Sequence, residues 1–375
     1  MTDRPTILFA GGGTGGHLYP GVSVAQALAA RWPNARPLFL CTTRAIDETI
    51  LTPTGFDYEK QPILPPVKSV GGLLSFWKSW RETKDLLKRV LNDHKPVAVL
   101  GLGGYAAGPA VKFCAEKGMP AAILNPDVLP GKANQFLFKY AKRVCCGFDA
   151  TREHVPAAHH DKLVVTGCPV RDDLIRLPPR AEAAKRLGLD PKLSTLTVTG
   201  ASQGAQTVNE AVIESLRTSK LQGWQVLHLA GRDHAAAVRT AYRDAGLAAV
   251  VIDFTPAMAD VWAVTDLAVA RSGASTCAEL TACGLASVLM PYPFHKDMHQ
   301  RANAKVLADA GAAVLLDDEK DRRRNSERLR PVLQSLLYDA PKRQAMAAAA
   351  KAMGRPDASA AVAAYVAGLA GLPGD

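Results

Sequence analysis

Short apolar runs alternate with longer amphipathic stretches along most of the chain. In the first half, five such runs indicate buried strands, at residues 6–10, 37–41, 97–101, 121–124 and 163–166. Apolar residues with helical spacing lie between them, for example at 22–31 and 109–117. Continuous apolar strands that alternate with helices are typical of a parallel sheet covered on both faces. The first half therefore predicts an α/β fold.

The same alternation begins again after residues 177–180, a Pro- and Arg-containing stretch that has no strong period and is the best linker candidate. Five further apolar runs follow, at residues 194–199, 225–229, 248–252, 267–270 and 287–290. The length of 375 residues also favours two domains over one. We therefore expect two doubly wound α/β domains of similar size, with a helical tail beyond about Asp357 that docks on either of them.

Charge and cysteine content narrow the class of protein. The 45 Lys and Arg residues outnumber the 35 Asp and Glu residues, and the net charge of +10 favours an anionic partner such as nucleic acid, a membrane face or a phosphorylated ligand. Seven cysteines without a C-x-x-C spacing fit neither a disulfide framework nor a zinc ribbon. The apolar run at 6–10 is too short for a secretory signal, and the stretch at 358–372 is too short for a membrane span. These features predict a soluble cytosolic protein.

The candidate chemistry begins with a glycine-rich loop, GGGTGGH at residues 11–17, which lies between the first predicted strand and a helix. Glycines let the backbone approach a ligand, and the N–H groups at a helix start favour negative charge. The loop also satisfies G-x-G-x-x-G, so a dinucleotide site is an alternative. That alternative needs an acidic residue near the end of the second strand, where the chain has Thr42, Thr43 and Arg44. An Arg there suits a 2′-phosphate, so NADP binding stays open.

Two more glycine-rich loops follow predicted strands: GLGGYAAG at residues 101–108 and GASQGA at 200–205. The second of these offers N–H groups and the Ser202 hydroxyl to a pyrophosphate, and a plain strand-to-helix turn is the alternative. Ligands of open parallel sheets bind beyond the carboxyl ends of the strands. Three such loops, spread over two domains, predict a cleft between them.

The segment RSGASTCAE at residues 271–279 also follows a predicted strand. Glu279 is placed to accept hydrogen bonds from a ribose diol, and a capping box formed by Thr276 and Glu279 is the alternative. His295 and His299 share a helical spacing but lack the H-E-x-x-H pattern and an evident third ligand. We expect them to be surface residues rather than metal ligands, and we expect the same of His154, His159 and His160.

These motifs and two others occur in one order, GGGTGGH (11–17), GLGGYAAGP (101–109), GCPVR (167–171), GASQGA (200–205), RSGASTCAE (271–279) and HQRANA (299–304). Each motif alone is modest, but the ordered set is highly specific. It closely resembles the bacterial MurG family, the transferases that move N-acetylglucosamine (GlcNAc) from UDP-GlcNAc to undecaprenyl-pyrophosphoryl-MurNAc-pentapeptide. The resemblance covers essentially the whole chain, residues 5 to 370.

The resemblance implies the GT-B architecture, in which two Rossmann-like doubly wound α/β domains face each other across a cleft. Residues 1–170 would carry the acceptor and membrane contacts, and a C-terminal helix at about 357–375 would return to this domain. Residues 171–356 would bind UDP-GlcNAc. The family's reaction inverts the anomeric centre without a metal or cofactor and forms the β-1,4 link of lipid II.

The resemblance also implies roles for individual residues. The diphosphates of donor and acceptor would be lined by Thr14, Gly15 and Gly16. The phosphates of UDP would be met by Arg171 and Ser202. Thr255 would lie beside the uracil and Gln300 against the GlcNAc hydroxyls. Six consecutive residues would hold the nucleotide and its ribose: Ala274, Ser275, Thr276, Cys277, Ala278 and Glu279. An inverting displacement needs a base near the attacking hydroxyl, and His17 at the end of the first glycine-rich loop is the best candidate.

One segment departs from the family pattern. The family usually carries His-Glu-Gln-Asn after the fourth strand, and its Asn contacts ligand, whereas this chain has Leu124-Asn125-Pro126-Asp127. Asp127 keeps an acceptor oxygen for the UDP-GlcNAc site, but its charge would oppose a nearby diphosphate by about 4 kcal/mol at 4 Å, for an effective dielectric near 20. Either Asn125 takes the role after a local shift, or this wall of the acceptor site differs.

A membrane contact is expected at residues 68–89, where basic residues are interleaved with five bulky apolar ones: Leu73, Leu74, Phe76, Trp77 and Trp80. Such a mixture suits an anionic membrane interface, as does the family's membrane-facing patch in this region. An ordinary amphipathic helix that packs its aromatic residues inward is the alternative.

The leading hypothesis is therefore GlcNAc transfer to lipid I at the cytoplasmic face of the inner membrane, without nucleic acid, metal or cofactor. The resemblance also leaves room for cell-wall and division proteins as partners. Within the same class, the alternatives are a glycosyltransferase for another lipid and a UDP-GlcNAc epimerase of this architecture. An NADP-dependent oxidoreductase and a catalytically silent membrane scaffold are the alternatives from other classes.

Overall fold

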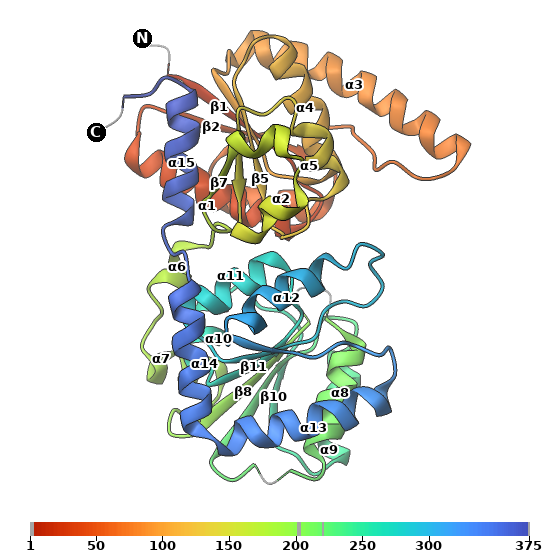
Figure 1. The fold of residues 1–375 in the computed structure, drawn as a ribbon, viewed down its shortest axis with the longest axis vertical. Coiled ribbons are helices and arrows are strands. Elements are labelled where there is room, and N and C mark those ends of the chain that lie inside the picture. The colour runs from red at the N-terminus through yellow and green to blue at the C-terminus, as the bar shows by residue number, and fades with distance from the viewer. Residues whose placement is uncertain (1–3, 201–203, 220, 374–375) are drawn as a thin grey trace. The chain divides into compact units, whose positions relative to one another are not determined.

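The computed structural model describes residues 4–200, 204–219 and 221–373, and the chain folds as two compact units (Figure 1). Unit 1 comprises Met1–Arg171 together with Arg355–Asp375, and unit 2 comprises Asp172–Gly354. Each unit has its own parallel sheet and its own apolar core. Among the described residues, no helix combines the length and the apolar character that crossing a bilayer requires.

The sheet of unit 1 has seven strands in the order β3-β2-β1-β4-β5-β6-β7, and all neighbouring strands are parallel. They are β1 (Thr6–Ala10), β2 (Arg36–Thr42), β3 (Asp57–Gln61), β4 (Ala98–Gly101), β5 (Ala121–Asn125), β6 (Arg143–Cys146) and β7 (Leu163–Val165). The predicted α/β class is confirmed, but β3 and β6 lie outside the predicted runs. The edge strand β3 reads DYEKQ and β6 has four residues, so neither carries a long apolar run.

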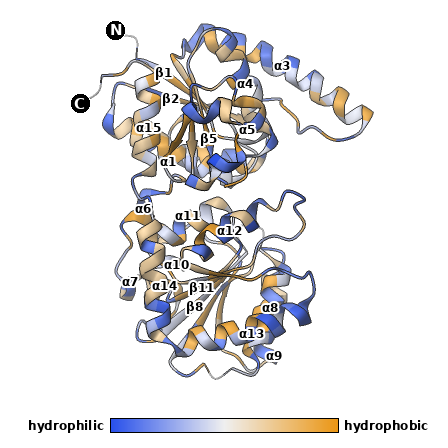
Figure 2. Cartoon of the chain, in the orientation of Figure 1, coloured by the Kyte–Doolittle hydropathy of each residue, from blue (hydrophilic) through white to orange (hydrophobic). Residues whose placement is uncertain are grey.

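Helices cover both faces of this sheet, because alternate residues of a strand point to opposite sides. In β1, Ile7 and Phe9 pack on the side of α1 and α15, whereas Leu8 and Ala10 pack on the side of α3 and α4. The strands β1, β2 and β5 are accordingly mostly hydrophobic (Figure 2). The helices of unit 1 are α1 (Gly15–Arg31), α2 (Ala45–Leu51), η1 (Thr52–Thr54), α3 (Val70–His94), α4 (Gly104–Glu116), α5 (Lys132–Leu137), η2 (Asp149–His154), η3 (Ala157–Lys162) and α15 (Ala358–Leu369).

The last helix of the chain, α15, completes the core of unit 1. Four of its small side chains are at most 1% exposed and share a cluster with α1: Val362, Ala363, Val366 and Ala367. Beyond the helix, the carbonyl oxygen of Pro373 accepts a hydrogen bond from the indole N–H of Trp32 at 2.9 Å. Small residues let two helices approach closely, so α15 is an integral part of this unit.

The sheet of unit 2 has six parallel strands in the order β10-β9-β8-β11-β12-β13. They are β8 (Ser194–Thr199), β9 (Trp224–Leu229), β10 (Ala249–Ile252), β11 (Leu267–Ala270), β12 (Ser287–Leu289) and β13 (Ala313–Leu315). The helices are α6 (Asp172–Ile175), α7 (Arg180–Leu187), α8 (Gln206–Leu216), α9 (Ala235–Asp244), α10 (Met258–Val264), α11 (Ala274–Cys283), α12 (His299–Asp309), α13 (Arg322–Tyr338) and α14 (Ala340–Met353). The second predicted α/β domain is thus confirmed, with β13 as one strand beyond the predicted runs.

A buried polar group lies in the core of unit 2. Nδ1 of His228 in β9 is 2.9 Å from the hydroxyl of Tyr242, and its Nε2 is 3.0 Å from Oδ1 of Asn209. Asn209 also donates to the carbonyl oxygen of Ala230 at 3.1 Å. Burial lowers the pKa of His228 to about 3. The imidazole is therefore neutral in the folded protein at neutral pH.

Protonation of His228 should destabilise unit 2 in acid. In the unfolded chain a histidine binds its proton with a pKa of about 6.5, whereas the folded protein binds it only near pH 3. The free energy of unfolding should therefore fall as the pH drops below about 6.5, by up to about 1.4 kcal/mol per pH unit. In urea unfolding between about pH 7 and pH 5, His228→Gln should show a shallower pH dependence than the wild type. His154→Gln, at an exposed site, should keep the wild-type slope, and equal slopes for all three proteins would contradict the prediction.

Candidate active site

The first glycine-rich loop makes a sharp turn between β1 and α1. Residues 11–13 all have positive φ angles, and a Cβ on Gly12 would collide with the carboxylate of Asp47. Helix α1 begins at Gly15 with Thr14 as its N-cap. The first N–H groups of a helix have no partner within it and favour negative charge in front of them. This end of unit 1 therefore suits an anionic ligand.

His17 lies in the first turn of α1, with the loop after β4 packed against its ring. A Cβ on Gly104 would lie 2.9 Å from Cε1 of His17, and one on Gly103 would lie 3.2 Å from Cδ2, so the ring requires small residues there. Oγ1 of Thr14 is 3.0 Å from Nδ1 of His17. Burial lowers the pKa of His17, although the charge of Asp127 opposes this shift. The neutral imidazole is thus favoured, as a general base requires.

A cavity of about 460 Å³ opens beside His17 in unit 1. Its aromatic wall includes Phe76 and Trp80 of α3, and its polar lining includes Asp127 and Lys132. Clefts that bind small molecules have volumes of about 300–1,000 Å³. The cavity therefore has the size and the mixed character of a ligand site, with the imidazole in its lining.

The segment 124–127, which differs from the family pattern, contributes Asp127 to this cavity, whereas Asn125 makes hydrogen bonds within the protein. The side-chain amide of Asn125 donates to the carbonyl oxygen of Asp127 at 2.7 Å, and its Oδ1 accepts from Nδ2 of Asn134 at 3.0 Å. Asn125 is only 1% exposed. These contacts disfavour the alternative in which Asn125 takes over ligand binding, and they favour a wall that differs from the usual family pattern.

Three residues that are predicted to contact UDP lie in different parts of the chain. Arg171 belongs to unit 1, where its guanidinium lies over the ring of Tyr19, 5.6 Å from the centroid. Thr255 follows β10 in unit 2, and its Oγ1 accepts from the N–H of Ala257 at 3.1 Å. Ser202 lies outside the described residues. Their contacts with UDP therefore stay predictions.

Glu279 is held by a contact that the sequence does not reveal. Helix α11 begins at Ala274 with Gly273 as its N-cap and has no side-chain cap hydrogen bond. The capping-box alternative is therefore wrong, because Thr276 already lies inside the first turn. The carboxylate of Glu279 instead accepts from Nε1 of Trp262 at 2.9 Å. The indole thereby fixes the direction of this carboxylate.

The other predicted nucleotide-binding residues cluster around the same helix start. Ala274 and Cys277 are buried at 7% and 1% exposure, so their side chains are turned inward. Gln300 lies beside them, with its Nε2 4.0 Å from the position of a Cβ on Gly273. Oε1 of Gln300 accepts from the N–H of Tyr292 at 2.9 Å. Unit 2 thus brings Gln300 and the segment 274–279 together.

A buried ion pair anchors the loop that leads into α11. Nη1 of Arg271 donates to Asp318 at 2.8 Å and to the carbonyl oxygens of Met290 and Pro291 at 2.9 Å each, and Nη2 donates to Thr207 at 2.8 Å. The side chains of Arg271 and Asp318 are 7% and 0% exposed. Although desolvation opposes it, the hydrogen bonds accepted by Asp318 lower its pKa. The pair therefore joins the loops after β11, β12 and β13.

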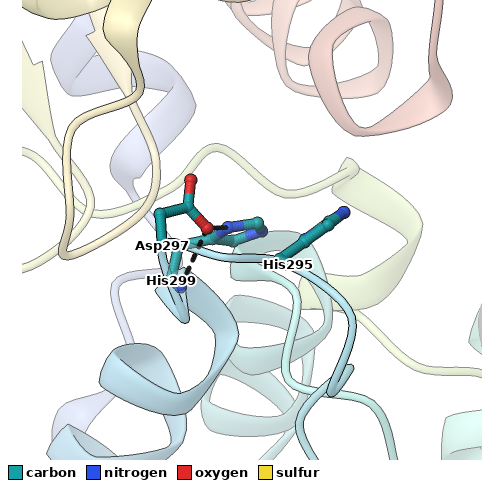
Figure 3. A group of neighbouring side chains, drawn as sticks. All are labelled: His295, Asp297 and His299. Atoms are coloured by element: carbon teal, nitrogen blue, oxygen red, sulfur yellow. Dashed lines mark hydrogen bonds and ion pairs between the residues drawn. The ribbon is translucent and has the colours of Figure 1, made fainter.

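A group that offers metal ligands precedes α12 and includes its first residue (Figure 3). Ligand atoms of His295, Asp297 and His299 lie within 4.8 Å of one another, and Asp297 is 2.7 Å from Nδ1 of His299. The two imidazole rings are stacked, with centroids 4.6 Å apart and planes inclined by 29°. Because imidazole lone pairs lie in the ring plane, stacked rings do not aim at a common ion. A cation would require one ring to turn, and the expectation of a metal-free reaction stays a prediction.

Comparison with known proteins defines the class. Residues 7–146 match the glycosyltransferase family 28 N-terminal domain, and residues 195–362 match the glycosyltransferase family 28 C-terminal domain. The crystal structure of Acinetobacter baumannii MurG is similar with a TM-score of 0.75 and 25% identity, covering 96% of this chain and 99% of that one. S. aureus MnaA with UDP has a TM-score of 0.72 at 11% identity, covering 99% and 98%, and shows the fold alone. The molecule is a UDP-GlcNAc-dependent glycosyltransferase of GT-B type.

Curated relatives specify the family. The Bacillus licheniformis UDP-N-acetylglucosamine--N-acetylmuramyl-(pentapeptide) pyrophosphoryl-undecaprenol N-acetylglucosamine transferase is 34% identical over 360 residues, covering 94% of this chain and 95% of its own. The Bacillus subtilis transferase of the same name is 31% identical over 361 residues, covering 94% and 96%. The chain belongs to this family, the MurG transferases, which confirms the resemblance drawn from the motifs.

Sequence reasoning missed two residues of these sites. Asp47 contacts the first glycine-rich loop. The search for an acidic residue considered only the residues directly after β2, and Asp47 lies five residues beyond its end, in α2. A search that included the first turn of α2 would have found it. Trp262 contacts Glu279, but an apolar residue in a helix indicates only core packing. Nothing in the sequence signals its contact.

Loss of the Asp318 charge should destabilise unit 2. Asp318→Asn leaves the buried guanidinium of Arg271 without a counter-charge, and breaking a buried pair in this way costs about 3–5 kcal/mol. Urea unfolding followed by tryptophan fluorescence measures the loss. Asp317→Asn is the matched control, because the neighbouring Arg301–Asp317 pair is 44% and 40% exposed and such pairs contribute about 0–1 kcal/mol. Equal losses in the two variants would refute the anchoring role.

Proposed function

We propose that this chain transfers GlcNAc from UDP-GlcNAc to undecaprenyl-pyrophosphoryl-MurNAc-pentapeptide, which converts lipid I to lipid II in peptidoglycan synthesis. The observation that carries the proposal is the pairing of Thr14 with His17 at the start of α1, beside the 460 Å³ cavity. Donor and acceptor follow from the relatives, whose printed name states both. The glycine-rich loop and the imidazole supply the two functions that the reaction needs, anion binding and proton transfer.

His17 is the general base of the proposed reaction. When Nδ1 donates its proton to Oγ1 of Thr14, Nε2 keeps the lone pair that a base needs. Nε2 takes the proton of the attacking MurNAc 4-hydroxyl as that oxygen forms a bond to C1 of GlcNAc. The bond between C1 and the UDP oxygen breaks in the same displacement, so UDP leaves with the electron pair and the anomeric centre is inverted.

The departing UDP carries negative charge that fixed groups must stabilise. We assign this role to the N–H groups of Gly15 and Gly16 at the start of α1, together with Thr14, Arg171 and Ser202. Helix N-termini and preorganised N–H donors stabilise developing charge in this way. The net charge of +10 suits an anionic donor and an anionic acceptor.

We assign the nucleotide and sugar contacts of the donor to unit 2. Glu279, oriented by Trp262, would accept hydrogen bonds from the ribose hydroxyls. Gln300 would bind the GlcNAc hydroxyls, with Thr255 beside the uracil. The inward-facing residues of the segment 274–279 would contribute backbone groups, and Ser275, Thr276 and Ala278 are half-buried at its surface.

The acceptor would occupy the cavity of unit 1. Asp127 lines it, and its charge would repel a diphosphate by about 4 kcal/mol at 4 Å for an effective dielectric near 20. We infer that Asp127 accepts hydrogen bonds from hydroxyl or amide groups of the acceptor sugar, and that the diphosphate lies nearer the start of α1.

Purified chain with radiolabelled UDP-GlcNAc and synthetic lipid I tests the proposal directly. We expect lipid-linked label that depends on lipid I. If label is transferred only to another polyprenyl-linked acceptor, the proposed acceptor is wrong. If UDP-N-acetylmannosamine forms without any acceptor, the epimerase is favoured. An intact nucleotide sugar after incubation with lipid I would contradict transferase activity.

His17→Ala should lower kcat by roughly 10²–10⁴, the usual contribution of a general base. The affinity for UDP, measured by calorimetry, should barely change because the base acts on the acceptor hydroxyl. His154→Ala, an exposed histidine of unit 1, is the control and should keep wild-type turnover. Near-normal turnover of the His17 variant with both substrates saturating would reject this role.

We infer that unit 1 docks on the cytoplasmic face of the cell membrane through the first turns of α3. Leu73, Leu74 and Trp77 are 47%, 66% and 58% exposed, whereas Phe76 and Trp80 line the cavity. Figure 2 shows hydrophobic residues at the N-terminal end of α3. Four exposed basic residues belong to the same segment of the chain: Lys68, Lys78, Arg81 and Lys84. Cell-wall and division proteins are further proposed partners, on the family resemblance alone.

Binding to vesicles that contain anionic lipid should depend on this surface and weaken with salt, since each nearby cation adds about 1 kcal/mol at low ionic strength. The double variant Leu74→Ser/Trp77→Ser should lose co-sedimentation yet still bind UDP, because both side chains are exposed. Tyr338→Ser, which removes a 58% exposed aromatic residue from unit 2, is the control and should bind as the wild type does. Undiminished binding of the double variant would move the membrane contact elsewhere.

A further inference from the structure

One residue of the first glycine-rich loop, Gly13, is held on both sides by the segment that follows β2. Its N–H donates to both carboxylate oxygens of Asp47, at 2.8 Å to Oδ1 and 2.9 Å to Oδ2. Its carbonyl oxygen accepts from Nη1 of Arg44 at 2.7 Å. We refer to these contacts of Gly13 with Asp47 and Arg44 as the Gly13 clamp.

Asp47 is itself fixed to the sheet. It is 0% exposed, and its Oδ2 also accepts from the backbone N–H and the hydroxyl of Thr42, at 2.8 Å each. Thr42 is the last residue of β2. Hydrogen bonds to an ionised group are roughly twice as strong as neutral ones. The carboxylate therefore links the end of β2 firmly to the loop after β1.

The clamp acts on a residue that controls the start of α1. Gly13 has a φ of 84°, in the left-handed region, and directly precedes Thr14, the N-cap of α1. Thr14 in turn lies 3.0 Å from Nδ1 of His17. A shift of Gly13 would therefore displace the imidazole and the first N–H groups of α1 together.

We propose that Asp47 and Arg44 are positioning residues of the transfer reaction, which hold Gly13 so that His17 and the start of α1 face the substrates in one fixed arrangement. The kinetic part of this inference rests on the proposed function, whereas the effect on the loop is measurable without substrate. These contacts also disfavour a dinucleotide site in this region, because both side chains bind the protein backbone. Arg44 directs a guanidinium nitrogen to the loop backbone, and Asp47 directs its oxygens to backbone N–H groups.

Two variants break the two halves of the clamp: Arg44→Met removes the donor to the Gly13 carbonyl, and Asp47→Asn removes the charged acceptor of its N–H. Misplacement of reacting groups by about 1 Å can cost on the order of 10²-fold. We expect each variant to lower kcat for lipid I by about 10- to 100-fold and to change KM for UDP-GlcNAc much less. Arg44→Lys keeps a charged donor and should recover most of kcat.

Arg36→Met is the matched control. It removes a guanidinium from the opposite end of β2, where Arg36 donates to Asp57 at 3.0 and 2.7 Å, and it should keep the wild-type kcat. Hydrogen–deuterium exchange of the peptide that covers residues 11–16 gives a second readout. Loss of a charge-assisted hydrogen bond should accelerate exchange there by more than about tenfold in the clamp variants and leave the control unchanged.

The two readouts separate the possible failures. Unchanged exchange in the clamp variants overturns the clamp whatever the transfer assay gives, and faster exchange with wild-type kcat overturns the positioning role. If Asp47→Asn does not fold, Arg44→Met decides, because Arg44 lies at the surface. A wild-type chain that makes no lipid II contradicts the proposed function, and the exchange measurement then still decides the clamp.

Discussion

Parallel strands end at the same edge of their sheet, and this constraint gathers the candidate chemistry in each unit. In unit 1 the loops after β1 and β4 meet at His17. In unit 2 the loops after β11, β12 and β13 meet at Arg271. Each glycine-rich loop also starts a helix, whose first N–H groups point to that edge. Residues far apart in the chain therefore form a site within each unit without any long contiguous motif.

In each unit, one buried carboxylate fixes one of these loops to a neighbouring element. Asp47 links the loop after β1 to the end of β2, and Asp318 links the loop after β11 to Thr207 of α8. Neither carboxylate is exposed to solvent. A buried charge is tolerated only when it is paired or fully hydrogen-bonded. The stability of each unit and the geometry of its loops consequently depend on the same few polar atoms.

The sequence predicts the fold class because apolar runs mark the central strands, and the ordered motifs identify the loops. It does not predict β3 or β6, because β3 is an edge strand that reads DYEKQ and β6 reads RVCC, so neither carries a long apolar run. The predicted runs also omit β13, although it lies in an apolar stretch at residues 312–316. The capping box at Thr276 fails because α11 starts earlier than that local rule assumes. The contacts of Trp262 with Glu279 and of Gly13 with Asp47 join residues 17 and 34 positions apart, so they depend on tertiary packing.

Because of helix α15, the two units are completed at different times during synthesis. A ribosome makes the strands of unit 1 before unit 2, yet α15, whose side chains cover α1, is made after unit 2. The apolar surface beneath α15 therefore stays uncovered on the nascent chain until all of unit 2 has been translated, and exposed surface of this kind is prone to misassociation. Unit 2 is one continuous segment and can fold during that interval. A chain that is released early can thus carry a complete unit 2 but never a complete unit 1, so prematurely terminated products lack the finished core behind His17.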